Sequence, residues 1–295
     1  MTQIIVNADD FGLTAGVNLA IAELHAAGVV TSASLMAHAT ATDGAIEIAR
    51  ATPSLGVGCH VVLVDGEPVL SAERDIPHLA GPLDGRFWSS MPGFLHWVYG
   101  FGSEGCYRIV AIREREIEAE TSAQIALLQN RGLHLTHIDT HKHTHMFPAV
   151  LRPVLRAAKA AGIRVVRNPF EPGWSLRATP HVPLLRRLEV NLLRLLHRKF
   201  MQIVADEGFS TTDGAIGVLA TGALDANTLA SLLRNLPPGT WELITHPGYN
   251  DAELARTHTR LLASRETERE ALMTLRQLTN VELTSFACLE ESQGQ

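Results

Sequence analysis

The sequence predicts an α/β fold in which seven or eight parallel strands close into an irregular (β/α) barrel. Three observations predict it: β-branched runs alternate with helical patterns, polar residues collect where the runs end, and no glycine-rich nucleotide motif follows the first run. Regular β–α alternation is typical of parallel α/β folds, and the missing G-x-G-x-x-G weakens the open, doubly wound alternative. We therefore expect a single barrel domain over residues 1–295.

The expected strands are short runs rich in β-branched residues. They cover residues 3–9, 32–37, 56–64, 135–141, 163–168, 215–220, 241–246 and 281–287. Helical patterns cover residues 16–27, 43–51 and 148–161. In the last of these, Pro148 stands at the start and Gly162 just past the end, which is the usual placement of these residues.

One excursion, at about residues 65–105, interrupts the alternation after the third strand. It holds a large share of the aromatic residues of a chain that is only 5% aromatic, namely Phe87, Trp88, Phe94, Trp97, Tyr99 and Phe101. A long loop after a barrel strand is a common place for a substrate wall, which makes Trp88 and Trp97 candidate substrate contacts. The alternative is a hydrophobic cluster that packs the excursion onto the barrel.

A second insertion, at about residues 170–205, contains the basic, leucine-rich stretch "PLLRRLEVNLLRLLHRKF" over 183–200. Such a segment could contact a membrane surface or an acidic partner. The favoured interpretation is an ordinary amphipathic helix whose leucine stripe faces the core.

Composition excludes several classes of protein. The formal net charge of −6 argues against nucleic-acid binding, and no apolar run approaches the roughly 18 to 20 residues that span a bilayer. The three cysteines have no C-x-x-C spacing, so neither a disulfide framework nor a thiolate zinc site is expected. Because the chain opens directly into a strand, we expect no signal peptide and a cytoplasmic protein; formation of a homo-oligomer stays open.

The densest chemical signal is the stretch "HIDTHKHTH". In an extended segment, side chains at His137, Asp139, His141, His143 and His145 would share one side. Residues two apart are separated by about 6.6 Å, so only one or two of these side chains can bind one metal. The others, Asp139 and His143 among them, would support the ligands, contact substrate or serve as alternative ligands. Imidazole with carboxylate suits Zn²⁺, Ni²⁺, Co²⁺ or Fe²⁺, and Mg²⁺ or Mn²⁺ are not excluded.

Other polar residues stand where predicted strands end, and these ends meet at one rim of a parallel barrel. Asp9 and Asp10 follow the first strand, His60 lies in the third, and His246 ends a late one. Asp10, His60 and one histidine of the cluster form a three-ligand set that leaves a position for water, which a metal acidifies. The spare carboxylate, Asp9, would accept the proton of that water, and His246 would protonate the leaving group. This assembly describes metal-assisted amide or ester hydrolysis.

The motifs "NADDFGLTAGVNLAI", "GCHVVLVDGEPV", "THIDTHKHTHMFP" and "THPGY", in this order, resemble the YdjC-like family of carbohydrate deacetylases, which includes ChbG and HpnK. The resemblance runs from the first strand to about residue 250. It implies a (β/α) barrel of the glycoside hydrolase/deacetylase type, one divalent metal held by one Asp and two His, and removal of an N-acetyl group from an amino sugar.

The resemblance also implies a role for each matching residue. Asp10 and His60 would be metal ligands, with His141 as the third and His143 as its alternative. Asp9 matches the general base and His246 the acid.

Two features favour the hopanoid-associated HpnK branch over the chitooligosaccharide branch: the stretch "VVLVDGEPVL", and Lys142 where a histidine is expected in the latter. That branch implies a lipid-linked N-acetylglucosaminyl substrate and gives the basic segment 183–200 a purpose at the inner membrane surface.

Two other functions remain open. One is a metal-dependent phosphoesterase or sugar isomerase, since barrels with Asp/His sites host both. Against the phosphoesterase, the expected rim offers few cations beyond Lys142 and Arg167. The other is a non-catalytic sugar-binding protein, which would have no need for an extra carboxylate beside a ligand.

Overall fold

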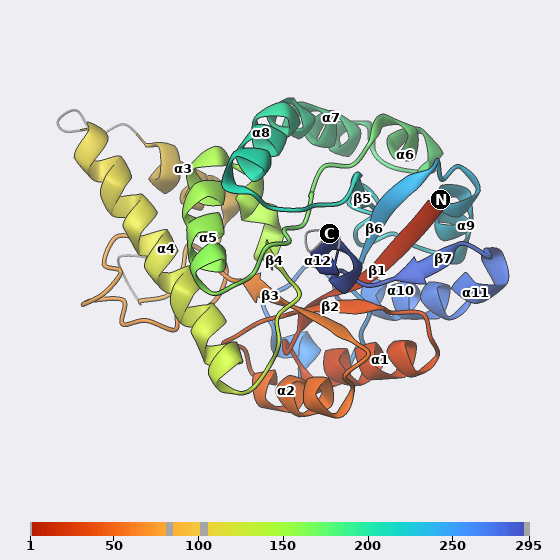
Figure 1. Ribbon diagram of the computed structural model, residues 1–295. Coiled ribbons are helices and arrows are strands. Elements are labelled where there is room, and N and C mark those ends of the chain that lie inside the picture. The colour runs from red at the N-terminus through yellow and green to blue at the C-terminus, as the bar shows by residue number, and fades with distance from the viewer. Residues whose placement is uncertain (1, 81–84, 101–105, 292–295) are drawn as a thin grey trace.

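The computed structural model describes residues 2–80, 85–100 and 106–291. All strand pairings of its seven-stranded sheet are parallel, and the sheet curls into a half-barrel with helices around its outside (Figure 1). The strands lie in the order β4-β3-β2-β1-β6-β5, with β7 paired to β1. Their bounds are β1 (Thr2–Phe11), β2 (Ser32–Leu35), β3 (Gly56–Val61), β4 (His137–Thr140), β5 (Gly214–Ile216), β6 (Gly239–Thr245) and β7 (Glu282–Thr284). The predicted α/β fold of seven or eight parallel strands in an irregular (β/α) barrel is confirmed, and the sheet takes the form of a half-barrel.

The prediction of a regular strand over 163–168 is wrong. This segment makes only isolated bridges, Ile138 to Val166 on one side and Val165 to Ser210 on the other. Its backbone hydrogen bonds are shared between β4 and the chain before β5, so neither ladder continues long enough to count as a strand. The segment nevertheless links the two edges of the half-barrel and carries Arg167 between them.

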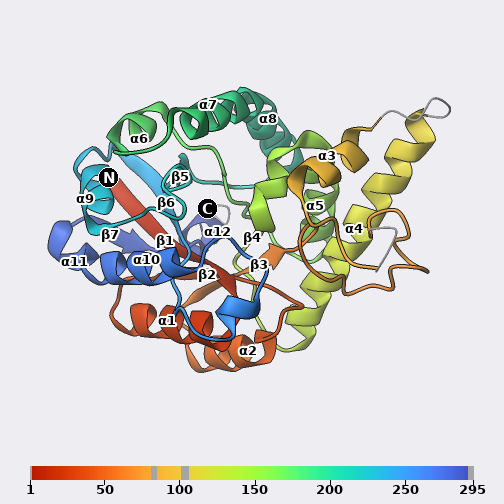
Figure 2. The same ribbon diagram turned by 180° about the vertical axis from the view of Figure 1, so that it is seen from behind.

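Most helices surround the sheet in both views, whereas α12 is drawn in the middle of the ring (Figures 1 and 2). They are α1 (Ala15–Ala26), α2 (Thr42–Ala51), α3 (Met91–Tyr99), α4 (Cys106–Asn130), α5 (Pro148–Ala160), α6 (Gly173–Ala178), α7 (Leu184–Leu193), α8 (His197–Glu207), α9 (Ala226–Arg234), α10 (Ala263–Met273), α11 (Leu275–Leu278) and α12 (Ala287–Glu291). The helices predicted over 16–27, 43–51 and 148–161 are confirmed as α1, α2 and α5. The side chain of Thr14 caps α1 by accepting a hydrogen bond from the Val17 amide, because a threonine oxygen can satisfy an amide that has no partner within the helix.

The interior of the half-barrel is partly filled by a histidine. His137 is fully buried and its ring stacks on Phe286 with centroids 3.9 Å apart. A Cβ atom at Gly58, on the neighbouring strand, would lie 2.4 Å from this ring, so only glycine leaves room for it. Burial and nearby Arg167 lower the pKa of His137 to about 3 although Asp139 opposes the shift, so this histidine is a neutral core residue.

The aromatic excursion packs onto the barrel beside α4, at one side of the molecule (Figure 1). Phe94 is fully buried and Trp97 is 8% exposed, with ring centroids 5.9 Å apart, and the Arg113 guanidinium lies over the Trp97 ring. These contacts favour the packing interpretation for Trp97. Residues 81–84 and 101–105, with Phe101, lie outside the described residues. We propose that both 65–105 and 170–205 are insertions in one barrel domain.

In the basic segment, the exposure of the leucine side chains contradicts the favoured interpretation that they face the core. Five leucines of α7 and the turn after it, Leu184, Leu185, Leu188, Leu192 and Leu195, have exposed fractions between 58% and 76%. Within α7 only Val190 is buried. The expected core-facing leucine stripe is therefore wrong, since most of the stripe faces outward. Among the described residues, no helix is both long enough and apolar enough to cross a membrane.

Candidate active site

The two adjacent aspartates at the end of β1 are brought to one side of the sheet by an irregular backbone. Asp10 has a left-handed backbone (φ 62°), Gly12 follows with φ 97°, and the register of β1 against β2 shifts between Ala8 and Phe11. A regular strand would send neighbouring side chains to opposite faces. The shift instead leaves Asp9 and Asp10 both buried and both facing the site, with different partners.

Asp10, His60 and His141 form the candidate metal centre. Asp10 Oδ1 lies 3.5 Å from His60 Nε2 and 3.2 Å from His141 Nδ1, and the two histidine nitrogens are 3.4 Å apart. Ligands about 2.0 Å from a tetrahedral metal are separated by about 3.3 Å, so these spacings suit a divalent cation. Asp10 Oδ1 is moreover buried without a hydrogen-bond partner, so its lone pairs are available to coordinate a cation. These three residues fit a metal.

Two of these three residues, Asp10 and His60, are held by a partner on their other side. Arg265, on α10, donates to Asp10 Oδ2 at 2.5 Å, which leaves Oδ1 for the centre. Burial raises the pKa of Asp10, but Arg265 and the two histidines outweigh burial and hold this pKa well below its usual value, so the carboxyl remains ionised. His60 Nδ1 lies 2.8 Å from Asp139 Oδ1, an arrangement that fixes the ring and directs Nε2 at the centre. Burial lowers the pKa of His60, but Asp139 and Asp10 raise it to a net value of about 10, so the surrounding charge favours a cation here.

Asp9, His60 and Asp139 are a second group whose ligand atoms lie within 4.8 Å of one another. Both carboxylates of this group already form ion pairs with Arg167. The group is therefore a poorer metal site than the first one. The short distances within this group nevertheless place an Asp9 oxygen within 4.8 Å of a His60 nitrogen.

Arg167 lies fully buried at the centre of three carboxylates. It contacts Asp9 through two nitrogens, at 2.8 and 2.5 Å, donates its Nε to Glu242 at 2.8 Å, and pairs with Asp139. Burial lowers the pKa of this guanidinium, but the carboxylates raise it well above the ordinary value. Burial conversely raises the pKa of Asp9, and Arg167 together with His60 brings it below the ordinary value. Asp9 is thus ionised and oriented.

The buried carboxyl of Glu242, on β6, predicts how the stability of the protein changes with pH. Burial raises its pKa to about 8 although Arg167 opposes the shift. Because the carboxyl of the unfolded chain titrates near 4.5, the folded chain binds more protons between about pH 5 and 8, and stability falls as the pH rises. We expect Glu242→Gln to remove this loss. The unfolding free energy of wild type minus that of the variant should then fall by up to about 1.4 kcal/mol for each unit by which the pH rises. Urea unfolding of both proteins from pH 5 to 8 measures the two free energies. An equal pH dependence in the two proteins would contradict a raised pKa for Glu242.

His246 follows β6 and faces Asp9 across the site. Its Nε2 lies 3.8 Å from Asp9 Oδ2, while its backbone amide donates to Glu268 at 2.6 Å. Glu268, a buried residue of α10, also accepts from the Gly222 amide, and so fixes two loops at this end of the sheet. His246 Nδ1 lies 3.9 Å from Glu268 and is buried without a hydrogen-bond partner.

The prediction that the histidine cluster shares one side of a strand is wrong beyond Thr140. Residues His141–Met146 form a 3-10 turn (η1) in which Lys142 and His143 have left-handed backbones. Thr140 stabilises the turn, because its side-chain oxygen accepts from the His145 amide and contacts the His145 ring at 2.7 Å. The turn brings only His141 to Asp10 and His60.

The other two histidines of this turn have separate positions. His145 is buried between Thr140 and the carbonyl of Arg167, which indicates a structural position. His143 is partly exposed, and its Nδ1 is buried without a hydrogen-bond partner. Burial and then Arg167 lower the pKa of His143, which keeps the ring neutral.

Three rim segments meet at Asp65. Its carboxylate pairs with Lys142 at 2.6 Å and with His258 at 2.8 Å. Trp88 is partly exposed on the excursion that Asp65 begins, and the Asp65 amide donates to the Trp88 carbonyl. The structure thus brings Trp88 to the segment that follows β3, whereas Trp97 and the fully buried Asp139 are enclosed by protein.

Sequence reasoning missed the site roles of four residues: Arg167, Glu242, Arg265 and Glu268. The sequence indicated Arg167 only as a rim cation for phosphate. Arg265 and Glu268 lie on one helix, three residues apart and hence on one face, but their partners are more than 200 and more than 20 residues away respectively. Glu242 alternates with buried apolar residues along β6, and a charged residue in such a run was the available signal.

The curled parallel sheet and its Asp/His group define a class of (β/α)-barrel protein with its polar site at the carboxyl ends of the strands. The chain belongs to the YdjC-like protein family, whose profile matches residues 3–279.

Three relatives named carbohydrate deacetylase illustrate the similarity. The one from Brevibacillus brevis is 41% identical over 157 residues, which are 53% of this chain and 56% of the relative. The one from Mus musculus is 33% identical, covering 84% of this chain and 78% of the relative. The one from Thermoanaerobacter pseudethanolicus is 26% identical, covering 98% of this chain and the whole relative.

Two solved structures share the fold. A protein from Enterococcus faecalis named for cellobiose-phosphate cleavage has a TM-score of 0.74 at 24% identity, covering 98% of both chains. A lactam utilization protein from Thermus thermophilus has a TM-score of 0.51 at 14% identity, covering 97% of this chain and all of that one. At these identities, the similarity concerns the fold alone.

Proposed function

We propose that this protein is a metal-dependent hydrolase that removes the acetyl group from an N-acetylated amino sugar. The observation that carries the proposal is the Asp10–His60–His141 group, with its unpartnered Asp10 oxygen, beside the ionised and oriented Asp9. The name carbohydrate deacetylase, borne by the relatives, supports the substrate class.

The chain's own residues would divide the reaction between them. A divalent metal at Asp10, His60 and His141 would polarise the acetamide carbonyl and acidify the attacking water. Asp9 would take the proton through Oδ2, because Oδ1 accepts hydrogen bonds from both Arg167 and Asn7 whereas Oδ2 accepts one, from Arg167. Arg167 would hold this carboxylate ionised and in place, as a base must be before it accepts a proton.

His246 would deliver a proton to the leaving amine of the sugar. Its Nε2 lies on the side of Asp9, so one proton could pass from the base to the acid across 3.8 Å as the site reorganises around substrate. We propose that Glu268 positions His246 through the backbone amide bond.

The partly exposed His143 and Trp88 are the proposed substrate contacts. His143 offers a neutral ring with a free nitrogen, and Trp88 an aromatic surface on the excursion. Asp139 would act through His60, which it contacts, because the carboxylate itself is fully buried.

The alternative of a phosphoesterase finds less support in the charges of the rim. Arg167 is enclosed by three carboxylates, and Lys142 is paired with Asp65. The two cations that the sequence indicated for a phosphate are thus already paired with protein carboxylates.

The substrate is either a soluble chitooligosaccharide or a lipid-linked N-acetylglucosaminyl group, and the latter would place the enzyme at the inner membrane surface. Acetate release from both substrates distinguishes them. A strong preference for soluble chitobiose would exclude the lipid-linked substrate.

We expect His60→Ala to lose bound metal and acetate release together, because two ligands are too few to retain a divalent cation at this site. Elemental analysis of purified protein, paired with the acetate assay, measures both quantities. The matched control is His134→Ala, at an exposed position away from the centre. Stoichiometric metal in the His60 variant would contradict the ligand set.

A further inference from the structure

The outward face of α7 is an apolar stripe without a protein partner in the described structure. Leu184, Leu185, Leu188, Leu192 and Leu195 are 58–76% exposed. They follow one another at spacings of one, three and four residues, so they form one continuous stripe along the helix. Single exposed leucines are common on protein surfaces, but five on one stripe indicate an interaction site.

The inward side of the same helix explains why this stripe cannot turn toward the core. Arg187 donates from two nitrogens to the carbonyls of Leu176 and Thr179, at 2.5 Å each. Arg186 donates to the carbonyl of Val218 at 3.3 Å, and Val190 is buried. The helix is thus fixed by arginine side chains on backbone carbonyls, and rotating it inward would break these bonds. The outward orientation of the leucine stripe is therefore fixed by the fold.

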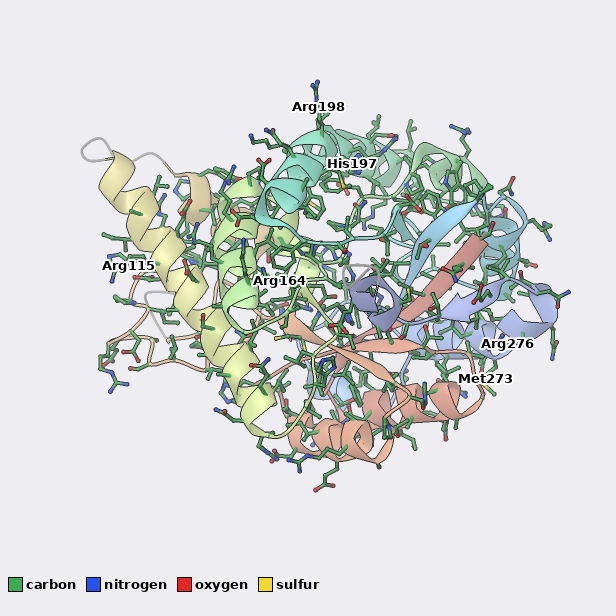
Figure 3. The ribbon with its side chains drawn as sticks, in the orientation of Figure 1. Arg115, Arg164, His197, Arg198, Met273 and Arg276 are labelled. Atoms are coloured by element: carbon green, nitrogen blue, oxygen red, sulfur yellow. The ribbon has the colours of Figure 1, made fainter. Side chains whose placement is uncertain are left out.

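The exposed stripe is accompanied by positive charge. Arg194, Arg198 and Lys199 are exposed at its carboxyl-terminal end, and Figure 3 shows Arg198 extending away from the body of the molecule. The only acidic residue between 183 and 200 is Glu189, which lies 3.6 Å from Arg186. This local positive charge stands out on a chain whose formal net charge is −6.

We propose that the face formed by α7 and the turn to α8 binds the surface of an anionic phospholipid bilayer. Leucines on one face of a helix insert at the level of the headgroups, and arginines and lysines beside them pair with lipid phosphates. A second copy of the chain fits less well, because it would bring two basic segments together. An acidic protein partner would satisfy the charge but leaves the length of the leucine stripe unexplained. The proposal does not depend on the proposed deacetylation.

The test is sedimentation of the full chain with vesicles of phosphatidylcholine alone or mixed with phosphatidylglycerol. We expect binding to the mixed vesicles, weakened by added salt, and at least about tenfold weaker binding of the variant Leu188→Gln/Leu192→Gln/Leu195→Gln. Arg198→Gln/Lys199→Gln should weaken binding to mixed vesicles and abolish their advantage over neutral ones. The matched control, Leu19→Gln/Met273→Gln/Leu278→Gln, removes three exposed apolar side chains elsewhere and should bind as wild type does.

Three results would overturn the proposal. They are failure of the wild-type chain to bind mixed vesicles, equal binding by the triple-leucine variant, and light scattering that shows a wild-type dimer lost in that variant. Because the leucines are exposed, the variant should keep the thermal midpoint of wild type. Acetate release from a soluble substrate should also be unchanged, which separates this test from that of the proposed function.

Discussion

Replacing Asp9 with asparagine is expected to lower kcat by about 10²- to 10⁴-fold, the usual range for loss of a positioned base. The physical reason is that an amide cannot accept the proton that Asp9 Oδ2 is placed to take. The metal should remain, because Asp10, His60 and His141 carry the centre and Asp9 is held by Arg167 instead. Acetate release and metal content, measured on the same preparation, test both expectations.

The control for this variant is Asp43→Asn, an aspartate with an exposed side chain that pairs with Arg131 at the surface. Its turnover should equal that of wild type. Unchanged turnover of a folded, metal-loaded Asp9→Asn protein would remove Asp9 from the mechanism, and loss of metal would make Asp9 part of the metal centre.

Replacing Arg167 with methionine is expected to lower the unfolding free energy by about 3–5 kcal/mol, because removal of one partner leaves buried charge uncompensated. Here the remaining charges are those of Asp9 and Asp139, and Glu242, largely protonated at neutral pH, loses its hydrogen bond; all three are at most 2% exposed. Denaturant unfolding followed by circular dichroism measures the loss.

Arg156→Met is the matched control, since Arg156 also pairs with two carboxylates, Glu114 and Glu118, but at the surface. Exposed pairs contribute about 0–1 kcal/mol, so this variant should lose little stability. Equal losses in the two variants would show that the three-carboxylate cluster does not depend on Arg167.

Prediction from the sequence succeeded where the signal is local. Helices α1, α2 and α5 were predicted within one or two residues, since apolar periodicity and end residues such as Pro148 are visible in a short window. Strand bounds were less accurate: the predicted strand over 135–141 is reduced to residues 137–140. The segment 163–168, whose pairing is divided between two neighbours, could not be distinguished from a strand.

The histidine turn shows why local pattern was insufficient for the site. An alternating sequence predicts an extended segment, but the left-handed backbones of Lys142 and His143 depend on Thr140 and His145 contacts that close a turn. The surface helix shows the same limit. Its leucine period is that of a core helix, yet the bonds from Arg187 to the carbonyls of Leu176 and Thr179 in the preceding segment hold the stripe outward.

The sequence by itself determined the α/β architecture and which residue types could form a site: the aspartate pair after the first strand and the histidines at the ends of later ones. These follow from periodicity and from the rule that parallel strands end at one rim. The tertiary structure alone decided which oxygen of Asp10 remains free, that Arg167, Arg265 and Glu268 hold the site, and which face of α7 meets solvent. The physical reason is that ion pairs and orientations join residues up to 255 positions apart, and a local pattern contains no record of such partners.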